Sequence, residues 1–87
     1  MVEYYVYALC SMQRNYIYVG MTTNVLRRYA EHNKGYERTT RPYRPFYLLY
    51  SEEHASRIDA RKREKYFKSG VGKEYLKRLR MDYKLDI

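Results

Sequence analysis

Two short segments near the N-terminus are rich in tyrosine, valine and isoleucine and show no helical periodicity. They are residues 4–10 (YYVYALC) and residues 16–20 (YIYVG). Such residues favour β-strands, and a four-residue loop, SMQR, joins them as a hairpin if Cys10 pairs with Asn15. In that register Tyr7 lies opposite Tyr18 on one face of the hairpin. The sequence does not determine the register, and a slip of one residue would separate the two rings.

The segment after the hairpin predicts a helix over residues 25–33. Thr23 and Asn24 offer capping side chains before it, and Gly35 is a typical stop after it. The predicted apolar stripe of this helix consists of Leu26, Tyr29 and Ala30.

Two pairs of polar side chains lie four residues apart on the same helix, one turn above each other. Arg28 and His32 can therefore face one site. Arg27 and Glu31 form the second pair, which we interpret as a surface ion contact.

The second half of the chain predicts a loop, a strand and two helices. They span residues 36–45, 45–50, 57–68 and 72–80, in that order. Pro45 prevents the strand from continuing upstream, and the spacing of Ser56 and Asp59 resembles a capping box before the first of the two helices. The last helix is expected to bury Tyr75, Leu76 and Leu79. The order strand, strand, helix, strand, helix, helix implies an α+β fold, a small three-stranded antiparallel sheet flanked by helices.

The length of 87 residues indicates a single domain over residues 1–87, because so short a chain cannot divide its core in two. Cys10 is the only cysteine, which excludes an internal disulfide and a cysteine-rich zinc site and fits a reducing compartment. The N-terminus, MVEYYVYALC, lacks the pattern of a signal peptide. No apolar run approaches the ~20 residues that span a bilayer. We therefore expect a cytoplasmic protein with no membrane partner.

The formal net charge of +8 is concentrated in the C-terminal half of the chain. Residues 57–80 carry ten lysines and arginines against three acids, whereas residues 1–56 carry seven against five. A polyanion is the natural partner of such a surface, because each phosphate neutralised by Lys or Arg releases condensed counterions. The alternative is a solvated basic face that only maintains solubility.

One acidic residue interrupts the apolar stripe of the helix over residues 57–68. Glu64 lies between Ala60 and Phe67 on the face that should be buried. A carboxylate withdrawn from water needs a partner, and a salt bridge to Lys68 or Arg61 would supply one. It can instead be a ligand for Mg²⁺, which needs only one or two carboxylates together with a substrate phosphate. No second acidic ligand is obvious, which fits one metal ion rather than two.

Four other side chains suit the same chemistry. Arg28 offers a planar cation to a phosphate, and His32 could transfer a proton or contact a phosphate. Tyr7 and Tyr18, if neighbours, could orient or deprotonate a water, although a phenol with a pKa of about 10 needs a metal or an arginine nearby to act as a base. Individually, strand tyrosines usually pack and a helical histidine is usually only hydrogen-bonded.

Taken together in this order, these residues resemble the GIY-YIG nuclease family. The resemblance rests on Tyr5-Val6-Tyr7, Tyr18-Val19-Gly20, Arg28, His32 and Glu64, and it extends from about Tyr4 to Leu79. It implies a three-stranded antiparallel sheet flanked by helices, and hydrolysis of phosphodiester bonds with one divalent ion, Mg²⁺ or Mn²⁺. The chain resembles the small stand-alone bacterial members of that family.

The resemblance also implies a role for each matched residue. Glu64 would hold the metal ion, Arg28 would stabilise the pentavalent phosphate, and one tyrosine would position or deprotonate the attacking water, with Tyr7 favoured over Tyr18 as the base. His32 matches a histidine that is common in this branch. Tyr5 and Met21 depart from the family pattern, which has a glycine at the first position and, in some relatives, a lysine at the second.

The expected partner is DNA, with RNA as the alternative, and the protein would act as a monomer or a homodimer. The residues expected to hold the nucleic-acid backbone are Arg38, Arg41, Arg44, Lys68 and Lys73. Backbone contacts give affinity without sequence choice, so cutting directed by structure or backbone is expected. Two alternatives stay open. One is a nucleic-acid-binding module that has kept the fold without turnover, and the other is a protein-interaction domain whose tyrosines only pack.

Overall fold

The computed structural model describes the backbone of residues 2–85 and the side chains as far as residue 81. Its elements are β1 (Tyr4–Ser11), β2 (Ile17–Thr22), α1 (Val25–Lys34), the 3₁₀ helix η1 (Arg41–Tyr43), β3 (Phe46–His54), α2 (Arg57–Lys68) and α3 (Gly70–Leu85). The predicted α+β class and the predicted order of strands and α-helices are confirmed. The short η1 helix within the predicted loop was not foreseen.

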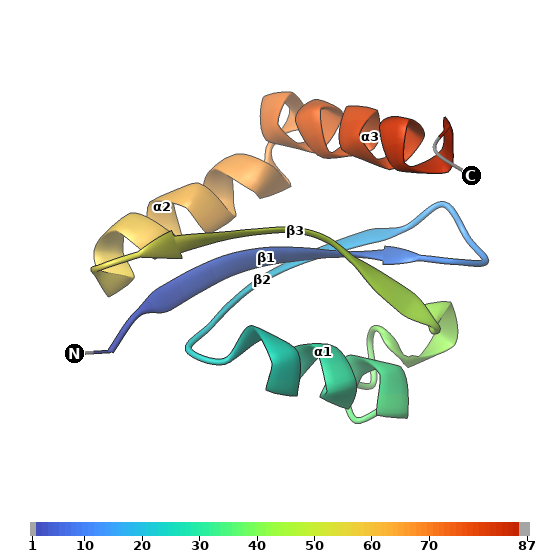
Figure 1. Cartoon of the computed structure of the whole chain (residues 1–87), viewed down its shortest axis with the longest axis horizontal. Coiled ribbons are helices and arrows are strands. Elements are labelled where there is room, and N and C mark those ends of the chain that lie inside the picture. The colour runs from blue at the N-terminus through green and yellow to red at the C-terminus, as the bar shows by residue number, and fades with distance from the viewer. Residues whose placement is uncertain (1, 86–87) are drawn as a thin grey trace.

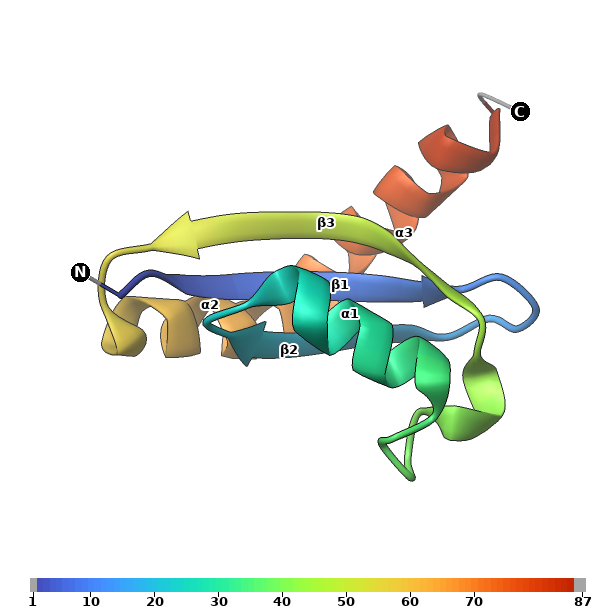
Figure 2. The same ribbon diagram turned by 60° about the horizontal axis from the view of Figure 1, so that its bottom comes forward.

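The three strands form one antiparallel sheet in the order β2-β1-β3. Helix α1 lies on one face of this sheet, and α2 and α3 lie on the other (Figure 1 and Figure 2). Successive side chains of the central strand point to opposite faces. Val6, Ala8 and Cys10 pack in the cluster that includes α2 and α3, whereas Tyr7 and Leu9 pack on the side of α1. The side chain of Tyr7 therefore lies on the face of the sheet that α1 covers.

The register of the β1–β2 hairpin differs from the prediction by two residues. Cys10 pairs with Ile17, and Tyr7 pairs with Gly20. The predicted pairing of Tyr7 with Tyr18 is therefore wrong. Because a shift of two residues preserves the alternation of faces, Tyr18 still lies on the same face as Tyr7.

Ser11 explains why the hairpin is longer than predicted. Its backbone N–H donates to the carbonyl of Tyr16 at 3.0 Å, which extends the ladder by one pair. Its hydroxyl oxygen accepts hydrogen bonds from the backbone N–H groups of Gln13 at 3.2 Å and Arg14 at 3.0 Å. These side-chain bonds place the loop at residues 12–15. The sequence did not predict this, because a serine within a predicted loop does not indicate the end of a strand.

The caps of α1 are as predicted and its last residue is Lys34, one residue beyond the predicted end, but its buried face differs from the prediction. The side chain of Asn24 accepts a hydrogen bond from the N–H of Arg27, and Gly35 ends the helix with a φ of 82°. Leu26, however, is 74% exposed. The predicted stripe is therefore wrong at that position, and Ala30 is exposed as well.

The face of α1 that meets the sheet carries Val25, Tyr29, His32 and Asn33. The hydroxyl of Tyr29 and the amide of Asn33 both donate to the carbonyl of Phe46, at 3.0 and 3.2 Å, and Asn33 also accepts from the N–H of Phe46 at 2.7 Å. These bonds attach α1 to the first residue of β3. A search for apolar periodicity fails here because the inward side chains are partly polar.

Strand β3 and helix α3 extend further than predicted. β3 continues to His54, because Glu52 is paired with Arg63 of α2 at 2.8 Å and so tolerates its half-buried place in the strand. Helix α2 has the predicted bounds, with Ser56 as its cap. Helix α3 begins at Gly70 and continues to Leu85.

The buried face of α3 is predicted correctly in most respects. Leu76 is fully buried and Leu79 is partly buried, but Tyr75 is 43% exposed even though its ring contacts those of Tyr50 and Phe67. Within the described part of the chain, no helix combines the length and the apolar character needed to cross a membrane.

Candidate functional site

Two tyrosines from β1 and β2 form the floor of the candidate site. The ring centroids of Tyr7 and Tyr18 are 6.1 Å apart. Both rings lie over Gly20, where an added Cβ would come within 2.8 Å of the Tyr7 hydroxyl and 2.9 Å of the Tyr18 ring. Real Cβ contacts are not this short, so glycine at this position makes the space that the Tyr7 hydroxyl occupies.

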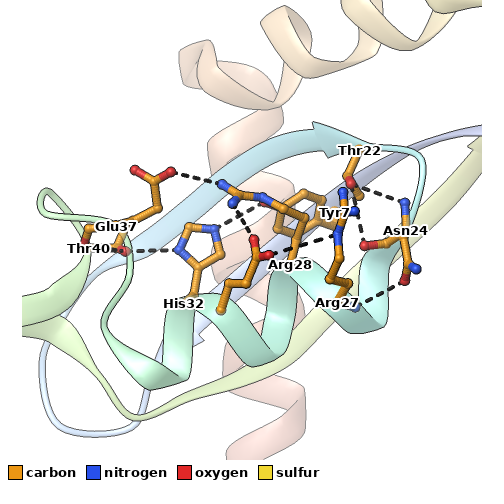
Figure 3. Close-up of polar contacts among 9 residues, drawn as sticks. Tyr7, Thr22, Asn24, Arg27, Arg28, His32, Glu37 and Thr40 are labelled. Atoms are coloured by element: carbon orange, nitrogen blue, oxygen red, sulfur yellow. Dashed lines mark hydrogen bonds and ion pairs between the residues drawn. The ribbon is translucent and has the colours of Figure 1, made fainter.

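His32 on α1 connects Tyr7 to the loop after the helix (Figure 3). Its Nε2 atom is 3.1 Å from the Tyr7 hydroxyl, and its Nδ1 atom is 2.9 Å from the hydroxyl oxygen of Thr40. The Thr40 hydroxyl donates its one proton to the carbonyl of Glu37. From this network we assign the proton of the neutral imidazole to Nδ1, which donates to Thr40, and the lone pair to Nε2, which accepts from Tyr7.

The protonation states agree with this assignment. Burial, together with the neighbouring Tyr18, raises the pKa of Tyr7, and Arg28 only partly offsets that increase. Burial and the charge of Arg28 lower the pKa of His32. At neutral pH Tyr7 therefore carries its proton and His32 does not.

Arg28 lies beside the Tyr7 hydroxyl and is held by two carboxylates (Figure 3). Its Nη1 atom is 2.7 Å from Glu31 Oε1, and its Nη2 atom is 3.2 Å from Glu37 Oε1. Burial lowers the pKa of Arg28, but hydrogen bonds with Glu31, Tyr7 and Glu37 outweigh it and raise the pKa. The guanidinium is therefore a permanent cation, placed beside the phenol by acidic partners.

Glu37 and Thr40 are part of this network and were not predicted. Both belong to the loop over residues 36–45, whose path back to α1 is a tertiary feature without a local sequence pattern. A buried neutral histidine needs a partner for each ring nitrogen, and this rule could have directed attention to Thr40. The predicted Arg27–Glu31 contact exists at 3.9 Å, but Glu31 lies closer to Arg28.

Glu64 lies in the other layer of the molecule. It comes from α2, its side chain is only 13% exposed, and its carboxylate pairs with Lys68 at 3.3 Å and Arg61 at 3.7 Å. The structure thus brings together Tyr7, Tyr18, Arg28 and His32. Among the described residues, no hydrogen bond, ion pair or ring contact joins Glu64 to these four.

A metal site at Glu64 stays a prediction. Over the described residues there is no cluster of three or more His, Cys, Asp or Glu side chains that could hold an ion. A largely buried carboxylate whose cationic partners are themselves exposed fits a site in which one carboxylate, waters and a substrate phosphate share the coordination. The donor set suits Mg²⁺ or Mn²⁺ in that form.

The predicted backbone-binding cations fall into two groups. Arg38, Arg41 and Arg44 lie in the loop that follows α1, where the Arg41 side chain also donates to the carbonyl of Gly35 at 2.8 Å. Lys68 and Lys73 lie on α2 and α3, in the opposite layer.

The comparisons with known proteins show the family to which the chain belongs. A family model described as the GIY-YIG catalytic domain matches residues 3–78. The chain belongs to the GIY-YIG family. The resemblance inferred from the tyrosine motifs, Arg28, His32 and Glu64 is thereby confirmed at the level of the family.

Several bacterial proteins are similar to this GIY-YIG chain over most of their length. A UPF0213 protein of Staphylococcus haemolyticus is 37% identical, with 88% of this chain and 94% of the relative covered. A UPF0213 protein of Limosilactobacillus reuteri is 35% identical, with 98% and 90% covered. The solution NMR structure of the UPF0213 protein BH0048 from Bacillus halodurans is 34% identical, has a TM-score of 0.53, and covers 88% of this chain and 84% of its own.

Membership in the GIY-YIG family supports a nuclease-type function in general. The names of the UPF0213 relatives state no activity.

Proposed function

We propose that this GIY-YIG protein is a divalent-metal-dependent endonuclease that hydrolyses phosphodiester bonds in DNA, with RNA as the alternative substrate. The observation that carries the proposal is the contact of Tyr7 with His32 and Arg28 at the position that Gly20 leaves open. A phenol, a neutral imidazole and a guanidinium in contact are suited to removing a proton from water next to an anionic phosphate.

Tyr7 is the proposed base, and His32 is its proton acceptor. As the hydroxyl oxygen of Tyr7 takes a proton from the attacking water, its own proton passes to Nε2 of His32, to which it is already hydrogen-bonded. The lowered pKa of His32 keeps Nε2 free to accept at neutral pH. Tyr18, the more exposed of the two phenols, would orient the water.

Arg28 is the proposed phosphate ligand. A guanidinium binds phosphate oxygens in the same fork geometry with which it binds carboxylates. Its present partners, Glu31 and Glu37, thus occupy the positions that phosphate oxygens would take. Substrate binding would exchange at least one carboxylate for a phosphate, and Arg28 would then stabilise the charge that develops on the pentavalent phosphorus centre.

Glu64 is the proposed metal ligand. A bound divalent ion would neutralise charge on the phosphate and on the leaving oxygen. To take part, the Glu64 carboxylate would give up its contacts with Lys68 and Arg61, whose side chains are 56% and 51% exposed and can turn to water. Those two cations would then be available to the nucleic-acid backbone.

The test is cleavage of supercoiled plasmid and branched DNA in Mg²⁺ or Mn²⁺ by the wild type and two variants. Tyr7→Phe removes only the hydroxyl and should lower the cleavage rate by at least about 10²-fold, the usual contribution of a general base. Glu64→Ala should abolish cleavage while DNA binding, measured in EDTA, stays nearly intact.

Tyr36→Phe is the matched control, because it removes the same atom from a ring that is 67% exposed and belongs to no described network. It should cut at the wild-type rate. Undiminished cleavage by Tyr7→Phe would overturn the assigned base, and undiminished cleavage by Glu64→Ala would overturn the assigned metal ligand.

A binding module without turnover is the second candidate function. It is favoured by one observation: Arg28 and Glu64, the two proposed phosphate and metal ligands, are both satisfied by ion pairs of their own. Salt-sensitive binding of DNA or RNA, without metal-dependent cleavage of any branched, duplex or single-stranded substrate, would support this candidate.

A further inference from the structure

The tip of the β1–β2 hairpin joins two basic parts of the molecule that lie in different layers. On one side, the Ser11 hydroxyl donates to the carbonyl of Tyr43 at 2.6 Å, and the N–H of Met12 donates to the carbonyl of Pro45 at 2.9 Å. These bonds attach the loop that carries the predicted arginines. On the other side, Arg80 of α3 donates to the side-chain oxygen of Asn15 at 2.6 Å.

Helix α3 and the hairpin enclose a groove of about 230 Å³. Its lining consists of Asn15, Tyr16, Ile17, Lys73, Lys77 and Arg80. The three cations recur at intervals of four and three residues, so they form one stripe of α3 that faces the hairpin. We name this space the α3 groove.

A second hollow, of about 270 Å³, continues the α3 groove around the hairpin tip. It shares Asn15 and Arg80 with that groove and adds Arg14. The guanidinium of Arg14 lies 5.7 Å from the centroid of the Tyr43 ring, in the loop on the opposite side. Arg14 thus lies between the cations of α3 and those of the loop over residues 36–45.

The described residues that line both hollows include cations and no acidic side chain. The nearest acid in the ion-pair network is Glu74, which contacts Lys77 at 3.6 Å and is itself 64% exposed. Apart from that exposed contact, the cations of the α3 groove have no carboxylate partner among the described residues. Positive charge collected in a groove beside an aromatic ring, here Tyr16, is the arrangement with which proteins follow a phosphodiester backbone.

We propose that the α3 groove binds the phosphodiester backbone of one substrate strand at a distance from the bond that is cut. The strand would run from the Tyr7–Arg28 face, past Arg14 at the hairpin tip, and into the groove, where Lys73, Lys77 and Arg80 contact its phosphates. The proposal rests on the proposed nuclease function and extends it by a second binding surface in the opposite layer of the molecule (Figure 1).

The proposal makes affinity depend on strand length. A short oligonucleotide fills the face that carries Arg28 and leaves the groove empty, whereas a longer one reaches both surfaces. The logarithm of the binding constant falls as the logarithm of the salt concentration rises. Each phosphate that the protein no longer neutralises makes this slope shallower by about 0.7 to 0.9. Removing two groove lysines should therefore lower that slope by about 1.5, for long strands only.

The experiment compares Lys73→Gln/Lys77→Gln with the wild-type chain. Binding of fluorescent oligonucleotides of increasing length is measured in EDTA at several salt concentrations, so no cleavage occurs. For long strands the double variant should bind about tenfold more weakly at low salt, which is about 0.7 kcal/mol for each of the two phosphates concerned. For the shortest strands it should bind as the wild type does.

Lys62→Gln/Lys65→Gln is the matched control. It removes the same charge from exposed positions on α2 that do not line the α3 groove. An equal loss of affinity in both double variants would overturn the proposal, because net charge alone would then explain the effect. A loss that is the same at every strand length would overturn it too.

The outcomes separate this proposal from the proposed function. If the wild type binds with the expected length dependence but never cleaves, the groove stands and the nuclease assignment fails. If the wild type cleaves and the groove variant keeps full affinity for long strands, the groove fails alone. If the wild type binds no nucleic acid at low salt, both fail.

Discussion

At the scale of single residues, the partners of Arg28 indicate how substrate would enter the site. Glu31 and Glu37 carry two negative charges against the one positive charge of Arg28, and His32 beside them is neutral. Glu37 holds Arg28 at the longer distance, 3.2 Å against 2.7 Å, and its side chain is the more exposed of the two. An incoming phosphate would therefore displace Glu37 first.

Glu37→Gln should weaken the contact with which this side chain competes with phosphate for Arg28. Because a partly exposed ion pair contributes about 0.2 to 1 kcal/mol, KM should fall by up to about fivefold at low salt. The kcat value should change little, because the phenol and the imidazole are untouched. Steady-state kinetics on one defined DNA substrate measures both constants. Glu53→Gln, which removes the same charge from an exposed position on β3, is the control. A rise in KM would mean that Glu37 holds Arg28 in its productive position.

At the scale of elements, the junction of β3 and α2 depends on one carboxylate. Glu52 accepts hydrogen bonds from Arg63 at 2.8 and 3.0 Å, from the hydroxyl of Tyr50 at 2.7 Å and from His54 at 2.6 Å. Burial raises the pKa of Glu52, but the bonds from Arg63, Tyr50 and His54 outweigh it and lower the pKa to about 2. These bonds join the edge strand to the helix that carries Glu64.

Glu52→Gln should lower the free energy of unfolding by about 3 kcal/mol at pH 7, the scale of a pKa that folding lowers from 4.5 to about 2. The folded pKa lies below the unfolded one, so the charged form stabilises the protein above about pH 4.5. That stabilisation is lost as the pH falls from about 4.5 to 2, so wild type and variant should converge there. Urea unfolding at a series of pH values measures the difference. Glu53→Gln, which removes the same charge from the neighbouring position on the other face of the sheet, leaves the bonds of Glu52 intact and is the control. A difference that stays constant down to pH 2 would contradict the role of this ion pair.

At the scale of the whole molecule, the sequence predicts best where local chemistry decides. The caps at Asn24, Gly35 and Ser56 each act within a few residues, and the helix ends they predict are confirmed. The prediction fails where a polar side chain takes an inward position, as His32 does on α1 while Leu26 points outward. The predicted hairpin register is also wrong because of a polar side chain: the hydroxyl of Ser11 accepts hydrogen bonds from the backbone of the turn.

The candidate site divides in the same way between what the sequence indicates and what only folding reveals. Tyr7, Tyr18, Arg28, His32 and Glu64 were assigned to one site, and the structure brings the side chains of the first four together. Glu37 and Thr40 were missed, because a loop of ten residues has no periodicity that would predict which side chains return to the helix. Glu64 was singled out by its place in an apolar stripe, a signal that indicates burial but does not indicate the partner.

The place of the proposed catalytic group on one face of the sheet also bears on how a double strand would be cut. Within the described residues there is one group made of Tyr7, His32 and Arg28, and it lies on the α1 side of the sheet. One such group can cut one strand in an encounter. We expect supercoiled plasmid to convert first to nicked circles, with linear DNA appearing only after a second, independent nick.

This expectation is measured by a gel time course at several dilutions of the protein, with sedimentation at the same concentrations. The rate of nicking should rise in proportion to the protein concentration, because each chain acts alone. Linear DNA that forms together with the nicked form, at a rate that rises with the square of the concentration, would contradict the expectation. Two chains would then act on one duplex, and the homodimer rather than the monomer would be the cutting unit.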